Sequence, residues 1–284
     1  MKTIWVLARL TFLEAGRRRI LWAALLLGIV FQAIFALGFH YVQEEVLGEM
    51  NGDPSGPSFL QLNEIRNFLL IAGLYVVNFL TVMMAVLTSV DTLSGEIGAG
   101  TIQSLVTKPI RRREVVLGKW LGFAILLSLY ILMMAGGVIA SVYLISGYLV
   151  EGALRGLGLI WLNGLLMVSL SMMGGAGLST LANGVLVFGL FGVAFVGGWI
   201  EHIGSFLDSQ AAINIGVLTS LILPSEALWR RAAFEMRSPL VDAIGFSPFT
   251  SAGSVPSPLM IAYALGYVVA VLAWGLRIFD KRDL

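Results

Sequence analysis

The sequence predicts an all-α integral membrane protein with six transmembrane helices, because three observations agree. Of its 284 residues, 58% are hydrophobic and only 12% are charged, whereas charged residues supply about a quarter of an ordinary soluble domain. Apolar stretches of about 20 residues, the length that a helix needs to cross the hydrocarbon layer, recur along the chain. All charged side chains lie outside six of these stretches, as expected for helices that face lipid.

The six predicted spans differ in length but share this lack of charge. They cover residues 20–39, 68–90, 120–145, 157–182, 184–200 and 259–276. The segment 40–67 is acidic and includes the turn formers NGDPSGPS, and LANG at 181–184 predicts a tight turn between the fourth and fifth spans. Arginines directly precede the first span and no small-x-small cleavage site follows it, so we expect this span to be retained rather than removed as a signal peptide.

Residues 3–18 predict a separate helix at the membrane interface. The apolar residues Trp5, Leu10 and Leu13 are interspersed with Arg9 and Glu14 at helical spacing, and an amphipathic helix of this kind lies along a bilayer surface. The alternative interpretation is a simple helical extension of the first span.

The region 201–258 predicts two short re-entrant helices on the outer side, between the fifth and sixth spans. The apolar run 213–224 is too short to cross a bilayer and has the length of a re-entrant or interfacial segment. A second helical segment, SEALWRRAAFEM, begins at Ser225. A seventh span is the competing interpretation, but it would move the basic carboxyl-terminal residues to the outside.

The distribution of basic residues predicts the orientation. With the amino terminus inside, thirteen Lys and Arg residues lie in inner segments and five in outer ones, so the positive-inside rule places both termini in the cytoplasm. The inner residues are Lys2, Arg9, Arg17, Arg18, Arg19, Lys108, Arg111, Arg112, Arg113, Lys119, Arg277, Lys281 and Arg282, and the outer ones are Arg66, Arg155, Arg230, Arg231 and Arg237.

Catalytic and metal-binding motifs are not found in this sequence. It contains no HExxH or GxSxG, no cysteine and only two histidines, so we expect neither a metal centre nor a catalytic site. The glycines from Gly95 to Gly100 have the spacing of a phosphate-binding loop, but a glycine stands before Thr101 where the loop would need its lysine. We therefore expect no cofactor in this chain.

The polar residues within the spans bear on the mode of energy supply. Gradient-driven carriers place an ionisable residue at mid-membrane, whereas these spans offer the amides Gln32, Asn78 and Asn163. An isolated amide in a span is more often an interhelical hydrogen bond than a substrate ligand. A gradient-driven carrier and a non-transporting scaffold remain the alternatives to a transporter that draws its energy from elsewhere.

The segment 95–119, GEIGAGTIQSLVTKPIRRREVVLGK, carries the richest polar pattern in the chain. TIQSLVT at 101–107 predicts a short helix that Pro109 ends, before the arginines open the next span. A positive-inside anchor explains these arginines, but it does not explain the glycine-flanked Glu96 or the separate short helix. A compact polar helix projecting into the cytoplasm suits docking onto a soluble partner.

This segment resembles the cytoplasmic loop of type-2 ABC exporter permeases, which reads GE, two or three residues, GT, a short helix, KP, R-R/E and GK. The six spans, the basic amino-terminal helix, the outer helices and the ending FDKRDL fit the same family, and the likeness is to its stand-alone permeases, such as that of nitrous-oxide-reductase maturation. The resemblance implies ATPase-coupling positions at Glu96, Gly100, Thr101, Gln103, Leu105, Lys108, Pro109, Arg112 and Arg113, with Gly118 and Lys119 also matching.

By this resemblance the chain is a single permease domain, 1–284, of an ATP-driven exporter in the inner or plasma membrane. ATP and magnesium would bind a separate ABC-type ATP-binding subunit, and a second copy or a similar permease would complete the path through the lipid bilayer. We expect the spans 68–90 and 184–200 to line that path, and we expect no nucleic-acid partner. An uncharged lining slightly favours a lipid-like or amphipathic substrate over a small ion.

Overall fold

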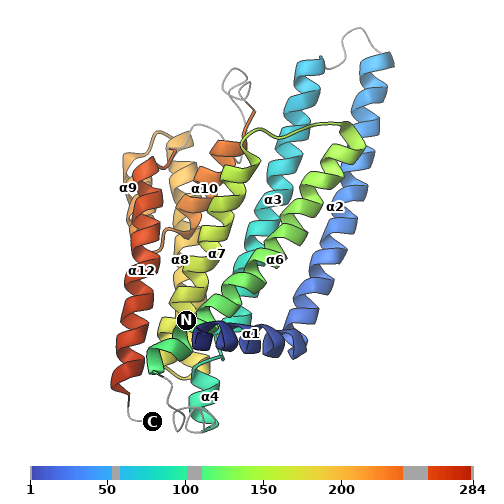
Figure 1. Ribbon diagram of the computed structural model, residues 1–284. Helices are drawn as coiled ribbons and strands as arrows, with labels where there is room; N and C mark the ends of the chain where they lie inside the picture. The colour runs from blue at the N-terminus through green and yellow to red at the C-terminus, as the bar shows by residue number, and fades with distance from the viewer. Residues whose placement is uncertain (1, 53–57, 101–110, 239–254, 283–284) are drawn as a thin grey trace.

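The computed structural model describes residues 2–52, 58–100, 111–238 and 255–282, and these residues form helices and no strands. Six of the helices in these ranges are long and apolar enough to cross a membrane, which confirms the predicted fold class. They run side by side along one bundle (Figure 1), and they are α2 (Arg19–Gly52), α3 (Phe59–Ser89), α6 (Arg112–Ser146), α7 (Ala153–Gly177), α8 (Thr180–Phe206) and α12 (Pro258–Lys281).

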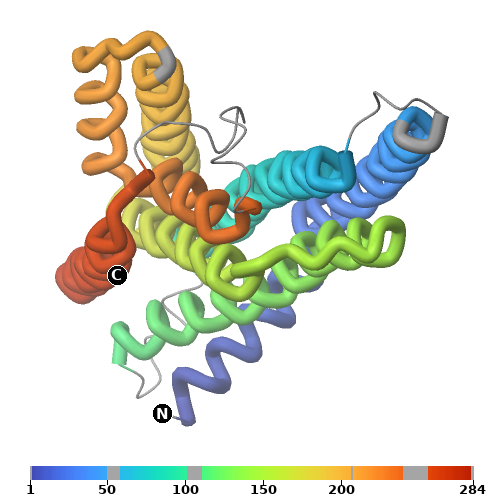
Figure 2. Tube along the Cα trace, turned by 90° about the horizontal axis from the view of Figure 1, so that it is seen from above, coloured from blue at the N-terminus to red at the C-terminus, as the bar shows by residue number. Residues whose placement is uncertain are grey.

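Helix α7 forms the centre of the bundle. In its most apolar stretch 78% of the residues are buried, against 11% for α2 and 22% for α12. Figure 2 shows α7 between the α2–α3–α6 group and the α8–α12 group, and α7 contacts α3, α6, α8 and α12. Hydrophobic side chains on α2 and α12 therefore point outward, as lipid-facing helices require.

Glycines allow the close packing around α7. A Cβ atom at Gly164 of α7 would lie 2.6 Å from Leu127 Cδ2 of α6, and one at Gly275 of α12 would lie 3.0 Å from the Cα of Met173. Small residues let helices approach closely where hydrophobic burial gives no driving force between them. The glycine-rich composition is thus used in part for packing within the subunit.

The helices extend beyond the predicted spans on the side of the 40–67 segment. Helix α2 continues to Gly52 and α3 begins at Phe59, so most of the expected loop is helical. Ser58 accepts a hydrogen bond from the Gln61 main chain and the Gln61 side chain binds the Ser58 amide, which forms a capping box. Hydropathy marks the hydrocarbon layer, whereas a helix continues through polar residues until the turn formers end it.

The turn between the fourth and fifth spans lies earlier than LANG predicted. Helix α7 ends at Gly177 and α8 begins at Thr180, with Ser179 as the N-cap that accepts a hydrogen bond from Ala182. Asn183, expected in the turn, lies in the first turns of α8 and donates to the carbonyls of Val90 and Ser171. The start of α8 is thus set by the N-cap Ser179 and not by the Asn183–Gly184 pair on which the prediction relied.

The amides in the spans bind other helices of the same subunit. Gln32 of α2 donates to the carbonyls of Met133 (2.8 Å) and Met134 (3.0 Å) in α6. Asn163 of α7 donates to Asn78 of α3 at 3.0 Å. These contacts confirm the interpretation of the amides as interhelical hydrogen bonds.

Helix α1 (Lys2–Arg17) runs across one end of the bundle rather than in line with α2 (Figure 1), so it is no simple extension of the first span. Leu7, Ala8 and Thr11 pack on α6, where Gly118 and Gly122 leave room for them. Trp5 and Leu10 on the other side are exposed. The interfacial location of α1 stays a prediction that this division of faces favours.

Helix α1, α4 (Ser94–Gly98) and the last residues of α12 lie at the same end of the bundle, which we call the termini end; the opposite part is the far end (Figure 1). At the far end α9 (Gln210–Ile222) and α10 (Ser225–Met236) follow one another with a bend of 105°. Helix α9 exposes Ile215, Leu218 and Leu221, whereas α10 is buried against α3, α7 and α8. Such a bent pair is either a re-entrant hairpin, as predicted, or a broken seventh span.

Candidate functional site

The predicted coupling segment lies at the termini end, between α3 and α6. Glu96 lies in α4, Gly100 follows this helix with a φ of +70°, and Arg112 and Arg113 open α6. The positive φ at Gly100 turns the chain out of α4 in a conformation that a residue with a Cβ disfavours. The remaining predicted positions, Thr101, Gln103, Leu105, Lys108 and Pro109, lie outside the described residues.

Glu96 forms an ion pair with Lys119 of α6. Only 5% of the Lys119 side chain and 19% of the Glu96 side chain is exposed, so water screens this pair little. It fixes α4 against the first turns of α6. Both residues were matched to the family pattern in sequence, but their pairing was missed because 23 residues separate them.

The start of α6 is also fixed to the end of α12. Arg113 Nε lies 2.6 Å from Asp280 Oδ2, and Arg112 donates to the carbonyls of Asp280 (3.3 Å) and Arg282 (2.6 Å). Arg282 in turn donates to the carbonyl of Ala176, at the end of α7, at 2.6 Å. The arginines bind carbonyls at helix ends, where these groups lack helical partners.

A third set of contacts joins α3 to the start of α8. Thr180 donates to Asp91 Oδ1 at 2.9 Å, and its hydroxyl lies 2.8 Å from that of Ser94. Arg18, between α1 and α2, lies 4.0 Å from Asp91, and both side chains are partly exposed. None of these partners was foreseen in the sequence, although Asp91 is the first charged residue after a predicted span.

These contacts fix both flanks of the segment 101–110. Glu96 holds the amino-terminal flank to α6, and Arg112 and Arg113 hold the carboxyl-terminal flank to α12 and thereby to α7. In the part of the chain that the structure describes, no group of three or more His, Cys, Asp or Glu residues could hold a metal ion. The arrangement is suited to mechanical linkage.

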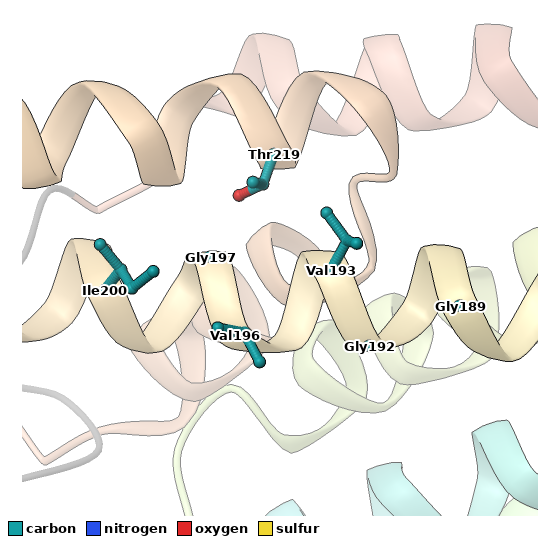
Figure 3. Close-up of a pocket in the computed structure, with 7 residues that line it drawn as sticks. All are labelled: Gly189, Gly192, Val193, Val196, Gly197, Ile200 and Thr219. Atoms are coloured by element: carbon teal, nitrogen blue, oxygen red, sulfur yellow. The ribbon is translucent and has the colours of Figure 1, made fainter.

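A groove of about 460 Å³ between α8 and α9 is the second feature of interest (Figure 3). On α8, Gly189 and Gly192 face open space, whereas a Cβ at Gly197 would lie 1.9 Å from Thr219 Oγ1 of α9. The hydroxyl of Thr219 supplies the polar atom in an otherwise apolar lining. The groove residues are Gly189, Gly192, Val193, Val196, Gly197, Ile200 and Thr219.

Comparison with known proteins agrees with this architecture. The family model for ABC-2 family transporter protein matches residues 5–284. Among curated proteins, a probable ABC transporter permease protein NosY from Stutzerimonas stutzeri is 28% identical over 174 residues. That match covers 61% of this chain and 56% of the length of the relative. Because the family model spans nearly the whole sequence, the chain belongs to the ABC-2 family of transporter proteins.

Proposed function

We propose that this chain is the transmembrane permease subunit of an ATP-driven exporter and that a separate ABC-type subunit binds ATP and magnesium for it. Membership of the ABC-2 family and the printed name of the NosY relative support the permease role. The export direction rests on the resemblance of the segment 95–119 to exporter loops.

The observation that carries this proposal is the fixation of both flanks of the segment 101–110. A force applied to this segment would reach α6 through Glu96 and Lys119, and α7 through Arg112 and Arg282. Helix α7 packs against most of the other spans. A partner docked at the termini end could therefore move spans as rigid bodies instead of bending one loop.

The orientation proposed from the basic residues agrees with a cytoplasmic ATPase. The thirteen inner Lys and Arg residues include those at both ends of the chain and those around the segment 101–110. The termini end would then face the cytoplasm of a cell with the protein in its inner or plasma membrane. The far end, with α9 and α10, would form an outer gate.

We propose that α3 and α8 line the path, together with a second copy of this chain or a similar permease. The glycine face of α8 is open at Gly189 and Gly192, which leaves space for a neighbouring helix or for substrate (Figure 3). An apolar lining with a single hydroxyl favours a lipid-like or amphipathic substrate, because the lining has too few polar groups to replace the water molecules that an ion would lose. Nucleic acid has no place in this scheme.

The test is affinity purification of the full chain from its native membranes in mild detergent, followed by an ATP hydrolysis assay. We expect a soluble ATPase to copurify, and we expect Glu96→Gln and Thr101→Ala to reduce its yield. Lys119→Met breaks the same ion pair and therefore controls for the stability that Glu96→Gln loses. Glu45→Gln is the matched control, because Glu45 is an exposed glutamate on α2 near the far end.

Three outcomes separate the classes of function. An ATPase that is retained by Glu45→Gln and lost with Glu96→Gln supports the coupling role. An ATPase that binds all variants equally, with unchanged transport into vesicles, contradicts the role of Glu96. Transport that collapses with the proton gradient and ignores loss of the ATPase would identify a gradient-driven carrier, and a scaffold would move nothing in either case.

A further inference from the structure

Three ionisable side chains meet at the far end between α8 and α10. Glu201 of α8 is 1% exposed, and its Oε1 lies 2.7 Å from Arg230 Nη1, while Arg230 Nη2 donates to Oε2 at 2.8 Å. Glu226 precedes Arg230 by one helical turn on α10 and is 8% exposed. The outer-helix prediction from sequence included these residues but gave them no common role.

The side chain of Glu226 faces α8. A Cβ at Gly198 of α8 would lie 2.2 Å from Glu226 Cγ, and Gly198 precedes Glu201 by three residues, on the same face of that helix. Glu226 and Glu201 therefore both lie close to Arg230, one from its own helix and one from the neighbouring helix. Arg230 forms its ion pair with Glu201, and it also acts electrostatically on Glu226.

Hydrogen bonding in this cluster is unequal. Glu201 accepts from Arg230, whereas Glu226 has no hydrogen-bond partner among the described residues. Arg230 Nε is buried and likewise makes no hydrogen bond in the part of the chain described. Because Glu226 is largely buried, desolvation penalises its carboxylate relative to its carboxylic acid.

The charge balance leads to the same conclusion. Arg230 is already paired with Glu201, so an ionised Glu226 would bring a second negative charge close to the same guanidinium group. Burial raises the pKa of the Glu226 carboxyl to about 7, with Arg230 opposing the rise and Glu201 adding to it. Burial thus shifts the loss of the Glu226 proton toward neutral pH.

The other titratable groups that face this site are few. Tyr75 of α3 and His202 of α8 interact electrostatically with members of the cluster. Helix α9 contains no titratable residue, α7 contributes only Arg155, which pairs with Glu235, and the far-end half of α12 contributes Tyr263 and Tyr267. Of the groups named here beside Glu226, His202 is the one that ordinarily titrates in the same pH range.

We propose that Glu226 is a proton-binding site in the contact between α8 and α10, and that loss of its proton weakens the Glu201–Arg230 pair that joins these helices. The step transfers one proton from the carboxylic acid to water. The resulting carboxylate competes with Glu201 for Arg230, one helical turn away. With the gating role proposed above, a bound proton favours the closed gate.

The direction of the pH effect follows from the raised pKa. The closed contact favours protonated Glu226, so it is most stable at acidic pH and weakens as the pH rises toward about 7. If Glu226 is solvated when α8 and α10 separate, the opening equilibrium increases by up to about tenfold for each pH unit below this value. Above it the opening levels off.

The first experiment observes the proton directly. Infrared difference spectra of the full chain in lipid vesicles, titrated from about pH 5 to about pH 9, should show the carbonyl band of a protonated carboxylic acid that is half lost near pH 7. Glu226→Gln should remove this band, and Glu235→Gln, on the same helix, should retain it. Glu226→Asp keeps a titrating carboxyl if the amide variant fails to fold.

The second experiment observes the helix contact. Hydrogen–deuterium exchange of residues 197–206 and 225–236, corrected for its intrinsic pH dependence, should accelerate between about pH 5 and about pH 7 and then level off. In Glu226→Gln the corrected exchange should stay slow at every pH. Absence of the titrating band, or an exchange profile that Glu226→Gln leaves unchanged, would overturn the proposal. Neither readout depends on whether the chain transports a substrate.

Discussion

The two ends of the bundle use charged residues differently. At the termini end the ion pairs differ in solvent exposure. The Glu96–Lys119 pair is buried, whereas 68% of the Arg113 side chain in the Arg113–Asp280 pair is exposed. At the far end the Glu201–Arg230 pair is enclosed, with 2% and 15% of the side chains exposed, beside an Arg155–Glu235 pair in which 79% of the Arg155 side chain is exposed. Exposed pairs are weak and can be exchanged for a partner's groups, whereas enclosed pairs fix one arrangement and respond to protonation.

The sharpest test of this contrast is Arg230→Met. This change leaves Glu201 buried without its cation, and breaking a buried pair in this way costs about 3–5 kcal/mol. We expect a large fall in the thermal unfolding midpoint in detergent. The double variant Glu201→Gln/Arg230→Met should recover much of the loss, because no buried charge is left unpaired; equal instability of the single and double variants would contradict this account.

Lys119→Met tests the buried pair at the termini end. Glu96 is partly exposed and can recover some solvation, so we expect a smaller cost of about 2–3 kcal/mol. A double-mutant cycle with Glu96→Gln should show that the two changes are not additive. If the losses of unfolding free energy in the two single variants add up to the loss in the double variant, the two side chains do not interact in the protein.

The αL glycines Gly147 and Gly152 provide a matched pair near the far end. Both have positive φ, +67° and +69°, but a Cβ at Gly152 would lie 2.0 Å from the carbonyl oxygen of Glu235 and one at Gly147 would meet nothing within 4 Å. Gly147→Ala should cost about 1–2 kcal/mol for the backbone conformation alone. Gly152→Ala should cost about 1–2 kcal/mol more, because the end of α10 must move.

Unfolding midpoints of the two alanine variants, measured side by side, check this difference. Asn67 of α3 also holds this end of α10, since it donates to the Met236 carbonyl and accepts from the Ser238 amide. If the Gly152→Ala and Gly147→Ala variants have the same unfolding midpoint, the close approach of Gly152 to the Glu235 carbonyl does not affect the stability of the fold.

Sequence alone predicted the spans but not the contacts that distinguish the two ends. Hydropathy and the absence of charge identify helices such as α7, because lipid requires both properties locally. The Glu201–Arg230 pair joins residues 29 apart, and Asn67 reaches a carbonyl 169 residues away. The periodicity of apolar residues does not predict contacts between residues this far apart in the sequence. The family pattern located Glu96 and Lys119, but only tertiary packing shows that they bind each other.

Arg113→Ala should have the smallest effect, and this is what makes it informative. Because most of the Arg113 side chain is exposed, the Asp280 pair should contribute about 0–1 kcal/mol to stability. The unfolding midpoint should change little at low salt and not at all at high salt, since screening removes exposed pairs first. If the termini end docks an ATPase, copurification should nevertheless weaken, because a basic side chain at the flank of the docking segment is lost. A large loss of stability that persists in high salt would show that this end is as rigidly fixed as the far end, and the contrast between the two ends would fail.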